Sequence, residues 1–477
     1  MRKKGSVTVF LTLILSLLLS LICASIESVR MASARTQILN GMDIGLYSLF
    51  GQYDKELLAD YDLFALDGSR GGGQLDLAAV CDELEAYMNP VLKQNSQKLT
   101  LCQSGLTGYR LLTDQKGEAF YQQIVGYMQE TLGSQGIQLL LGRMSERQEK
   151  TAQADQSANQ AQSKGSIDRY DSEMNQASEK SQQAAEEAQV VPQAPPAKNP
   201  ITIMKRIMKR GVLELVLPGG NGLSTKEIEK GTLVSGRGLQ QGMEMPDGMT
   251  VENSYTSEVL FQQYLMEHLG NYAEPSSTGL AYQVEYIFGG KDSDEDNLKA
   301  VASKLLFIRE GVNFACLMAD NVKRSEAQAL ATAIASGFLV PPAAVIIEAA
   351  LILCWAFAES VLDVRELFAG GRIPLVKSSG DWQISLGNLP DLMEGLDSMR
   401  RNDEKGMSYK DYLQVLVLTV SKEKKVMRAM DMIENTIREK GRKNFCMDSC
   451  IVALEAFADV KANKKKDFQV IRQYCYE

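Results

Sequence analysis

The chain has 477 residues, well beyond the size at which one hydrophobic core stops growing, so more than one folded lobe is expected. A formal net charge of −9 opposes binding to phosphate backbones, and the short basic runs at residues 205–210 and 464–466 are typical of solvated surfaces, so we expect no nucleic-acid partner. The single histidine, His268, all but excludes multi-histidine metal sites and is the only histidine for a Ser-His or Cys-His catalytic pair.

The N-terminal region contains an uncharged stretch of 22 residues, from Gly5 to Ile26. As a helix it would span roughly 33 Å, enough to cross a hydrocarbon core of ~30 Å. Arg2, Lys3 and Lys4 precede it, and the positive-inside rule places residues 1–5 in the cytoplasm and the rest of the chain outside. The sequence therefore predicts a single-pass cell-membrane protein with its transmembrane helix at residues 6–26 and the lipid bilayer as partner.

A cleaved secretory signal is the alternative, because Ala32-Ser33-Ala34 resembles a signal-peptidase site. The apolar run is longer than the usual ~7 to 15 residues of a signal, and two charged residues separate it from these alanines. We therefore expect the helix to be retained as an anchor. Its small residues Ser16, Ser20 and Ala24 are suited to lateral packing against other membrane helices.

Residues 3–10, KKGSVTVF, lead directly into this helix and are followed by ESVR at 27–30. This start resembles tight-adherence (Tad) pseudopilins of the TadE/TadG type. It looks closer still to uncharacterised Gram-positive proteins found with such pilus genes, which share segments similar to QYDKELLADYDLFALD, here 52–67, and MSYKDYL, here 407–413.

The resemblance implies a processing site between Gly5 and Ser6, where a prepilin peptidase would cut, and it implies other pilin-like subunits and the Tad assembly machinery as partners. Pseudopilins carry a glutamate four or five residues after the glycine that helps assembly, whereas this chain has Val9 and Phe10. We therefore expect a membrane-held minor component instead of the major filament subunit.

Beyond the membrane, apolar residues at three-to-four-residue spacing predict an amphipathic helical stalk at residues 27–66. A first α+β lobe is expected at 67–150, with a helix near 76–88, a strand pair at 99–112 and a helix at 118–149 interrupted by Gly133 and Gly136. Residues 151–200 are rich in Gln, Ala, Ser, Glu and Lys and offer no apolar face, so they are predicted to be a low-complexity linker.

A second α+β lobe is expected at residues 201–477. Alternation at 280–288 predicts a strand, and aspartates at 292–296 predict the start of a helix that runs to about 320. The remaining predicted elements are an amphipathic segment at 201–216, helices at 409–419 and 422–440, and strands at 451–457 and 468–474. The predicted fold class is therefore α+β: a transmembrane helix, an amphipathic stalk and a two-lobed extracytoplasmic region.

The strongly apolar stretch 327–360 allows two interpretations, a buried helix or a second membrane pass. Pro341, Pro342 and Glu348 interrupt it, and an ionised group at mid-bilayer costs at least ~2.5 kcal/mol. We therefore favour the buried helix.

Candidate chemical motifs are weak. Asp292, Asp294 and Asp296 alternate as in a calcium loop, but Asn297 and Ser303 stand where an EF-hand needs glycine and glutamate, so helix capping is favoured. The glycines around Arg237 favour a turn, and His268 a structural role. Cys446 and Cys450 lack further metal ligands at matching spacing, and whether the cysteines are reduced or paired stays open.

No catalytic residue, cofactor site or metal site can therefore be named, and we expect no enzyme. The favoured function is that of a cell-surface structural or interaction protein, a pseudopilin-like accessory of Tad-type pilus assembly or secretion. The alternative is a surface-anchored ligand-binding module or a carbohydrate-active enzyme, since glycoside hydrolysis needs only an Asp/Glu pair, although no pair can be singled out.

Overall fold

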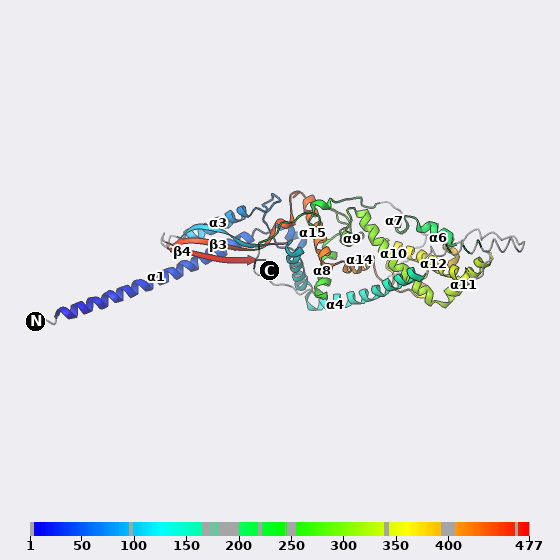
Figure 1. Cartoon of the computed structure of the whole chain (residues 1–477), viewed down its shortest axis with the longest axis horizontal. Helices are drawn as coiled ribbons and strands as arrows, with labels where there is room; N and C mark the ends of the chain where they lie inside the picture. Colours follow the sequence, from blue (N-terminus) through cyan, green and yellow to red (C-terminus); the bar gives the residue numbers. More distant parts are fainter. Residues whose placement is uncertain are drawn as a thin grey trace. The chain divides into compact units, whose positions relative to one another are not determined.

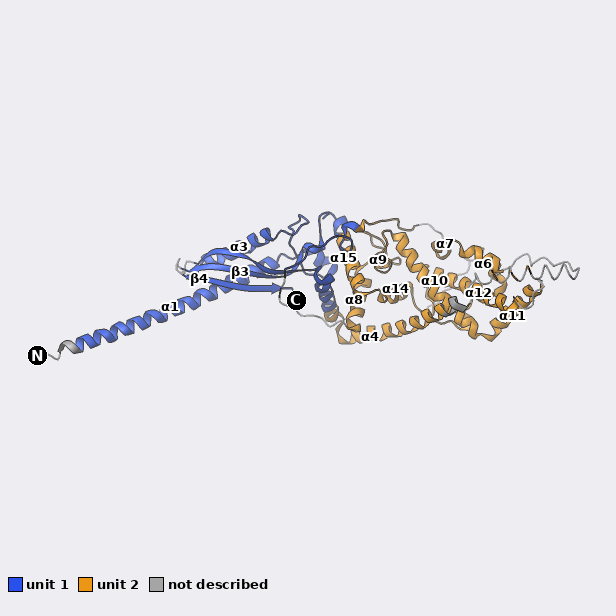
Figure 2. Cartoon of the chain, viewed as in Figure 1, with its two compact units in different colours: residues 1–127, 231–252, 437–477 blue, residues 128–230, 253–436 orange. Residues whose placement is uncertain are grey.

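A computed structural model shows a helix-rich chain with an antiparallel sheet, which confirms the predicted mixture of helices and strands (Figure 1). The structure describes residues 4–94, 99–164, 200–217, 222–243, 254–337, 343–392, 406–462 and 466–476, together with the single residues 172, 176, 179 and 245. Unit 1 comprises Met1–Tyr127, Gly231–Glu252 and Ile437–Glu477, and unit 2 comprises Met128–Lys230 and Asn253–Thr436 (Figure 2). The predicted second lobe thus contributes two segments to unit 1.

Helix α1, Lys4–Phe50, joins the predicted transmembrane helix and most of the predicted stalk in one continuous helix. Residues 7–29 are exposed, whereas Ile38, Met42 and Leu46 are buried in the core of unit 1. The four-residue spacing of these three positions places them on one helix face, which packs onto the sheet and onto α3. A short helix, α2 (Lys55–Tyr61), follows.

The sheet of unit 1 is built on β3, Cys450–Ala462. It pairs antiparallel with β1 (Leu66–Asp67), β2 (Leu99–Leu111) and β4 (Lys466–Cys475). The two C-terminal strands predicted at 451–457 and 468–474 are thereby confirmed, and both are longer than predicted. The predicted strand pair at 99–112 is wrong, because β2 is a single strand: Gly105 does not form a turn but lies beneath Phe457, whose ring carbon Cε1 would be 2.6 Å from an added Cβ.

Helix α3, Leu77–Lys93, covers the same face of the sheet as α1 and confirms the helix predicted at 76–88. Its N-cap is Asp76, whose carboxylate accepts a hydrogen bond from the Ala79 amide at 3.0 Å. The two helices approach closely at Gly45, where an added Cβ would lie 2.6 Å from Cγ of Met88.

Helix α4, Asp114–Lys164, is much longer than the helix predicted at 118–149, and Gly133 lies within it at φ 61°. Residues 151–164 of the predicted linker are helical and continue α4. Thr151 and Ala154 are buried there, and Asp155 pairs with Lys304 at 2.8 Å, because this turn packs within unit 2. Apart from residues 172, 176, 179 and 200, the rest of the predicted linker lies outside the described residues.

Unit 2 is helical in its described part. Its helices are α6 (Pro200–Met208), α7 (Val212–Val216), α8 (Tyr255–His268), α9 (Gln283–Gly289), α10 (Asp294–Ala319), α11 (Asn321–Gly337), α12 (Ala344–Phe368), α14 (Tyr409–Leu418) and α15 (Lys422–Glu439, whose last three residues belong to unit 1). The helices predicted to end near 320 and to span 409–419 and 422–440 are confirmed as α10, α14 and α15.

The strand predicted at 280–288 is wrong, because the structure forms α9 there. All residues from 280 to 287 are buried, so this part of the helix has no face exposed to solvent. Its sequence therefore lacks the 3.6-residue alternation of apolar and polar residues that marks a surface helix. The alternation of aromatic and smaller residues was therefore not evidence of a two-sided strand.

The apolar stretch at 327–360 forms parts of α11 and α12, and Pro341 and Pro342 lie outside the described residues. Within the described chain, α1 and α12 are long and apolar enough to cross a membrane, but the most apolar window of α12 is 78% buried and that of α1 is 0% buried. Helix α12 is therefore the central helix of unit 2, as the favoured interpretation predicts.

Candidate functional site

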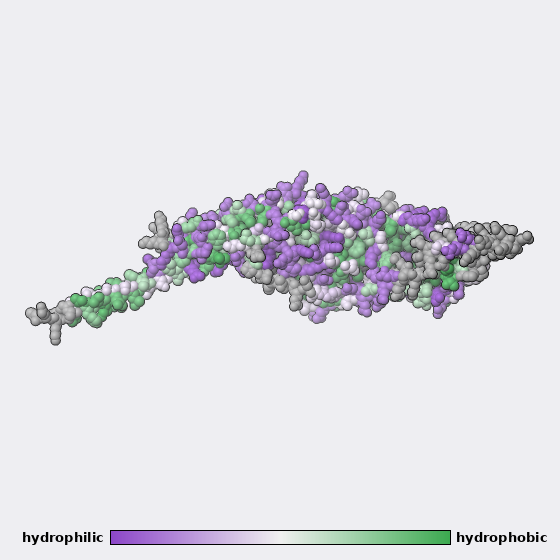
Figure 3. Space-filling model, viewed as in Figure 1, coloured by the Kyte–Doolittle hydropathy of each residue, from purple (hydrophilic) through white to green (hydrophobic). Residues whose placement is uncertain are grey.

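The first candidate site is the anchor segment, which we define as residues 7–29 of α1. Its apolar side chains are exposed along the helix, with Phe10 at 63%, Leu17 at 68% and Val29 at 69% of full exposure. Figure 3 shows hydrophobic residues over this part of the chain. Large contiguous apolar surfaces of this kind mark membrane or protein interfaces.

The hydroxyl groups of the anchor segment bond within their own helix. Thr12 donates to the Val9 carbonyl at 2.9 Å, Ser16 to the Leu13 carbonyl at 2.9 Å, and Ser20 to the Leu17 carbonyl at 2.8 Å. A bilayer core requires such internal satisfaction of polar groups. The predicted packing residues Ser16, Ser20 and Ala24 are all exposed, whereas the predicted processing residues Gly5 and Ser6 lie in the first turn of α1, where side chains are not described.

A second candidate is the Arg442 cluster of unit 1, formed by Arg442 and the carboxylates of the segment 52–67. Arg442 donates to Asp54 at 2.5 Å, to Asp67 at 3.1 Å and to Glu56 at 3.4 Å. Asp54 is also the N-cap of α2, where it accepts from two backbone amides. The segment 52–67 thus contacts the loop after α15 through these ion pairs.

A pocket of about 330 Å³ lies beside this cluster. It is lined by Asp67, Gly71, Gly441, Arg442, Lys443, Asn444 and Phe445. The guanidinium of Arg442 lies 4.7 Å from the ring centroid of Phe445. Because Arg442 is already engaged by three carboxylates, the pocket offers no free cation at this position.

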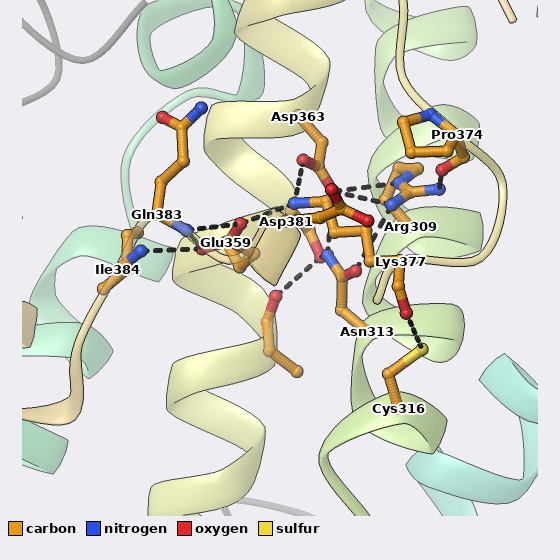
Figure 4. A network of polar contacts seen from close by, with 12 residues as sticks. Arg309, Asn313, Cys316, Glu359, Asp363, Pro374, Lys377, Asp381, Gln383 and Ile384 are labelled. Atoms are coloured by element: carbon orange, nitrogen blue, oxygen red, sulfur yellow. Dashed lines mark hydrogen bonds and ion pairs between the residues drawn. The ribbon is translucent and has the colours of Figure 1, made fainter. Parts of the chain in front are cut away.

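A third candidate is the Asp363 network of unit 2 (Figure 4). Asp363 on α12 accepts hydrogen bonds from Arg309 at 2.8 and 3.0 Å and from Asn313 at 2.9 Å, both on α10. Lys377 contacts Asp363 and Glu359, each at 2.5 Å. All four charged side chains are buried, and two cations face two anions.

The same network fixes the segment that follows α12. Glu359 accepts from the backbone amide of Ile384 at 3.0 Å, and Arg309 donates to the carbonyls of Pro374 and Leu375 at 3.0 and 2.8 Å. Burial alone would raise the pKa of Asp363, but the charges of Arg309 and Lys377 outweigh it and lower the pKa, so Asp363 stays ionised. The four charged side chains of the network pair with one another, and they join α10 and α12 to the segment that follows α12.

A fourth buried group is Glu285 on α9, whose side chain is fully buried. Its Oε1 accepts from the hydroxyl of Tyr409 at 2.6 Å and from the amide of Tyr272 at 2.8 Å. Its Oε2 has no hydrogen-bond partner among the described residues. Burial raises the pKa of Glu285 to about 7, although the two hydrogen bonds to Oε1 oppose the rise.

The segment 407–413 contacts residues of both buried groups. Besides the Tyr409 bond to Glu285, Asp411 pairs with Arg147 at 2.7 Å and the hydroxyl of Tyr412 accepts from Arg309 at 3.3 Å. Ser408 and Asp411 form a capping box at the start of α14. Each side chain of this motif named here therefore has a structural partner within unit 2.

The residues of the considered calcium loop have separate partners. Asp294 is buried and accepts from Ser224 and two backbone amides, Asp296 accepts from Ser293, and Asp292 pairs with Lys230 at 3.2 Å. The N-cap of α10 is Ser293. Within the described chain, no three His, Cys, Asp or Glu side chains form a group that could hold a metal ion.

The other residues considered from the sequence also have structural roles. His268 stacks on Tyr264 with ring centroids 4.2 Å apart. Arg237 in the glycine-rich turn pairs with Asp448 at 2.5 Å. All eight cysteines are free thiols, and Cys446 accepts a hydrogen bond from Arg438 at 3.3 Å.

Comparison with known proteins places the chain in a family. A model described as "Family of unknown function (DUF5702)" matches residues 192–462, more than half of the chain. The chain belongs to the DUF5702 family. No curated protein and no solved structure matches it. The DUF5702 match includes the Asp363 network, Glu285 and Arg442, whereas α1, α3, β2 and β4 lie outside it.

Proposed function

We propose that this chain is a membrane-anchored cell-surface structural or interaction protein that serves as a pseudopilin-like accessory of Tad-type pilus assembly or secretion. One observation carries the proposal: α1 is a single helix whose exposed apolar part continues without a break into the core of unit 1. An anchor built in this way transmits its position in the bilayer directly to the folded domain.

The burial of Ala34 supports retention of the anchor. Ala34 is 1% exposed and is the first residue of α1 in the core of unit 1, one turn before Ile38. A signal-peptidase cut after Ala34 would therefore divide the helix at the edge of the core. Helix packing thus accounts for the small residue at position 34.

The pilus part of the proposal rests on the resemblance of residues 3–10 and 52–67 to Tad-associated proteins. Lateral association would use exposed small residues of the anchor segment such as Ser16 and Ser20, whose hydroxyls are internally bonded and need no lipid or partner acceptor. Val9 and Phe10 in place of a glutamate support the role of a minor component.

The test is N-terminal mass analysis of the full chain from its own cells, with separate assays of the membrane fraction and the medium. We expect membrane-bound protein that begins at Ser6, and a Gly5→Leu variant that keeps residues 1–5. Membrane-bound protein that begins at Met1 would agree with the anchor but contradict the pilin-like processing. A start at Arg35 in the medium would overturn the whole proposal.

Ala32→Leu is the matched control, because it alters the alternative cleavage motif at an exposed position of the same helix. It should leave the product unchanged. In wall-stripped cells, added protease should degrade the chain beyond residue ~70, in accordance with the positive-inside rule. Protection of the C-terminal part would show instead that α12 crosses the membrane.

A further inference from the structure

The inference concerns the end of unit 1 that lies beside the anchor segment. Helix α1 and strand β4 lie side by side and run in the same direction (Figure 1). Lys466 lies 3.8 Å from Glu27, Arg472 lies 3.0 Å from Asp43, and the rings of Tyr474 and Tyr47 are 6.4 Å apart. The start of β4 is thereby held next to Glu27.

Glu27 is the first charged residue after the uncharged stretch that begins at Gly5. If α1 spans a bilayer, the stretch of roughly 33 Å fills the hydrocarbon core and Glu27 lies at the headgroup level. The contact between Glu27 and Lys466 then places the β3–β4 end of the sheet at the bilayer surface. This position of the β3–β4 end follows from the length of the apolar helix combined with the contact between Glu27 and Lys466.

We define the basic tip as Arg30 and Arg35 of α1, Lys461 of β3 and Lys466 of β4, all of which are exposed. The described exposed acidic groups in direct contact with it are Glu27 and Asp467, which lie 3.8 Å from Lys466 and 3.7 Å from Lys461. Such long, exposed pairs hold little binding energy and leave the cations available to other anions.

The charge of the tip is opposite to that of the whole chain. The tip contains four cations, of which Lys461 and Lys466 each have one acidic partner within 4 Å, whereas the formal net charge of the chain is −9. A local excess of lysine beside a membrane helix is the arrangement that attracts anionic lipids.

We propose that the basic tip binds the anionic headgroups of the bilayer in which α1 is anchored. The inference rests on the proposed membrane anchoring and adds a second contact, which fixes the tilt and rotation of unit 1 at the surface. Each basic side chain near an anionic surface contributes roughly a fivefold preference. Loss of Lys461 and Lys466 should therefore reduce the selection of anionic lipid by at least about fivefold.

The first experiment measures lipid selection by the full chain. Protein in a nonionic detergent is mixed with equimolar phosphatidylglycerol and phosphatidylcholine, repurified, and its bound lipids are quantified by mass spectrometry. We expect enrichment of phosphatidylglycerol that falls at least fivefold in the double variant Lys461→Gln/Lys466→Gln. Lys55→Gln, which changes an exposed lysine at the other end of α1, should keep the enrichment.

The second experiment measures the accessibility of the lysines in liposomes. Acylation of Lys461 and Lys466 by a water-soluble amine reagent should be several-fold slower in vesicles with phosphatidylglycerol than in pure phosphatidylcholine, and ~1 M salt should abolish the difference. Lys55 should react equally in both. Equal acylation rates of Lys461 and Lys466 in the two kinds of vesicle would overturn the inference. This holds even if a soluble polyglycerol phosphate protected the same lysines, because the tip would then bind a phosphate polymer and not the lipid headgroups.

The two proposals fail in distinguishable ways. If α1 does not anchor the chain, the protein will not float with liposomes of either composition, and the proposed function fails. If the protein floats with both kinds of vesicle, but lipid selection and lysine reactivity do not depend on phosphatidylglycerol, only the lipid contact is wrong.

Discussion

Asp54 combines two roles that involve residues far apart in the chain. It caps α2 through the amides of Glu56 and Leu57, and it accepts a hydrogen bond from Arg442, which follows 388 residues later. Its side chain is almost wholly buried, so its charge needs the guanidinium. The segment 52–67 is therefore a structural element of unit 1 as well as a sequence motif.

We predict that Arg442→Gln lowers the free energy of unfolding of unit 1 by about 2 kcal/mol, because it leaves Asp54 buried without its cation. Chemical denaturation of the full chain in detergent provides the measurement. Lys440→Gln is the control, since it removes an exposed pair with Asp60 and should cost no more than about 1 kcal/mol. Equal effects of the two substitutions would contradict this role of Arg442.

In unit 2, Asp363 is likewise a buried carboxylate that pairs with cationic side chains, here Arg309 and Lys377. Asp363→Asn leaves Arg309 and Lys377 buried with a single carboxylate, and we expect it to destabilise unit 2 by about 3–5 kcal/mol. Arg324→Gln, which affects an exposed ion pair with Glu348 at 3.7 Å, should cost less than about 1 kcal/mol. Thermal unfolding followed by circular dichroism would measure both, and a mild effect of Asp363→Asn would show that the network is dispensable.

Among the elements, helices with capping residues at their starts were predictable from sequence. Asp76 marks the start of α3, and Ser408 that of α14, because a short polar side chain before an apolar periodic run is a local signal. The same local reasoning failed at α9, which is buried on all sides, and at β2, whose Gly105 accommodates an aromatic ring of the neighbouring strand.

Helix α9 also carries the pH prediction. The pKa of Glu285 is about 7 in the folded chain against an ordinary value of 4.5, so the folded state binds its proton more tightly than the unfolded state. Its stabilising contribution is complete below pH 4.5 and is lost as the pH rises to 7 and above, by a total on the order of 3 kcal/mol.

Glu285→Gln should therefore flatten the rise in stability that the wild type shows between pH 7.5 and 5. Thermal melts over this range measure the difference between the two proteins. Glu274→Gln, which alters an exposed carboxylate nearby, should keep the wild-type slope. A Glu285→Gln protein with an unchanged slope would show that Glu285 keeps its charge throughout.

For the whole molecule, the helix that precedes the predicted linker extends further than the sequence suggests. Residues 151–164 belong to α4 and contact unit 2, whereas the composition argument for a linker still applies to 165–199. We predict that deletion of 165–199 leaves the melting temperature within a few degrees. Deletion of 151–164 should lower the melting temperature clearly. If deletion of 165–199 lowered the melting temperature more than deletion of 151–164, the boundary predicted at residue 151 would be correct.

The candidate sites were less predictable than the helices. The partners of Arg309 come from α12, α14 and the segment 374–375, and those of Arg442 lie near the other end of the sequence. Local periodicity contains no information about such long-range pairs. The apolar helix at residues 7–29 was predictable because its signal, length and lack of charge, is contained within one continuous stretch.

The central position of β3 affects how unit 1 can be made. Strand β2 ends at Leu111, and its partner β3 begins at Cys450, so ribosomes adding ~5 to 20 residues per second need roughly 20 to 70 s to supply the strand that completes the sheet. During this interval α1 can pack on α3 but not on the completed sheet, so the core around Ile38, Met42 and Leu46 stays incomplete. Unit 1 should therefore become resistant to proteases only after residues 450–475 have been synthesised and β3 and β4 can pair.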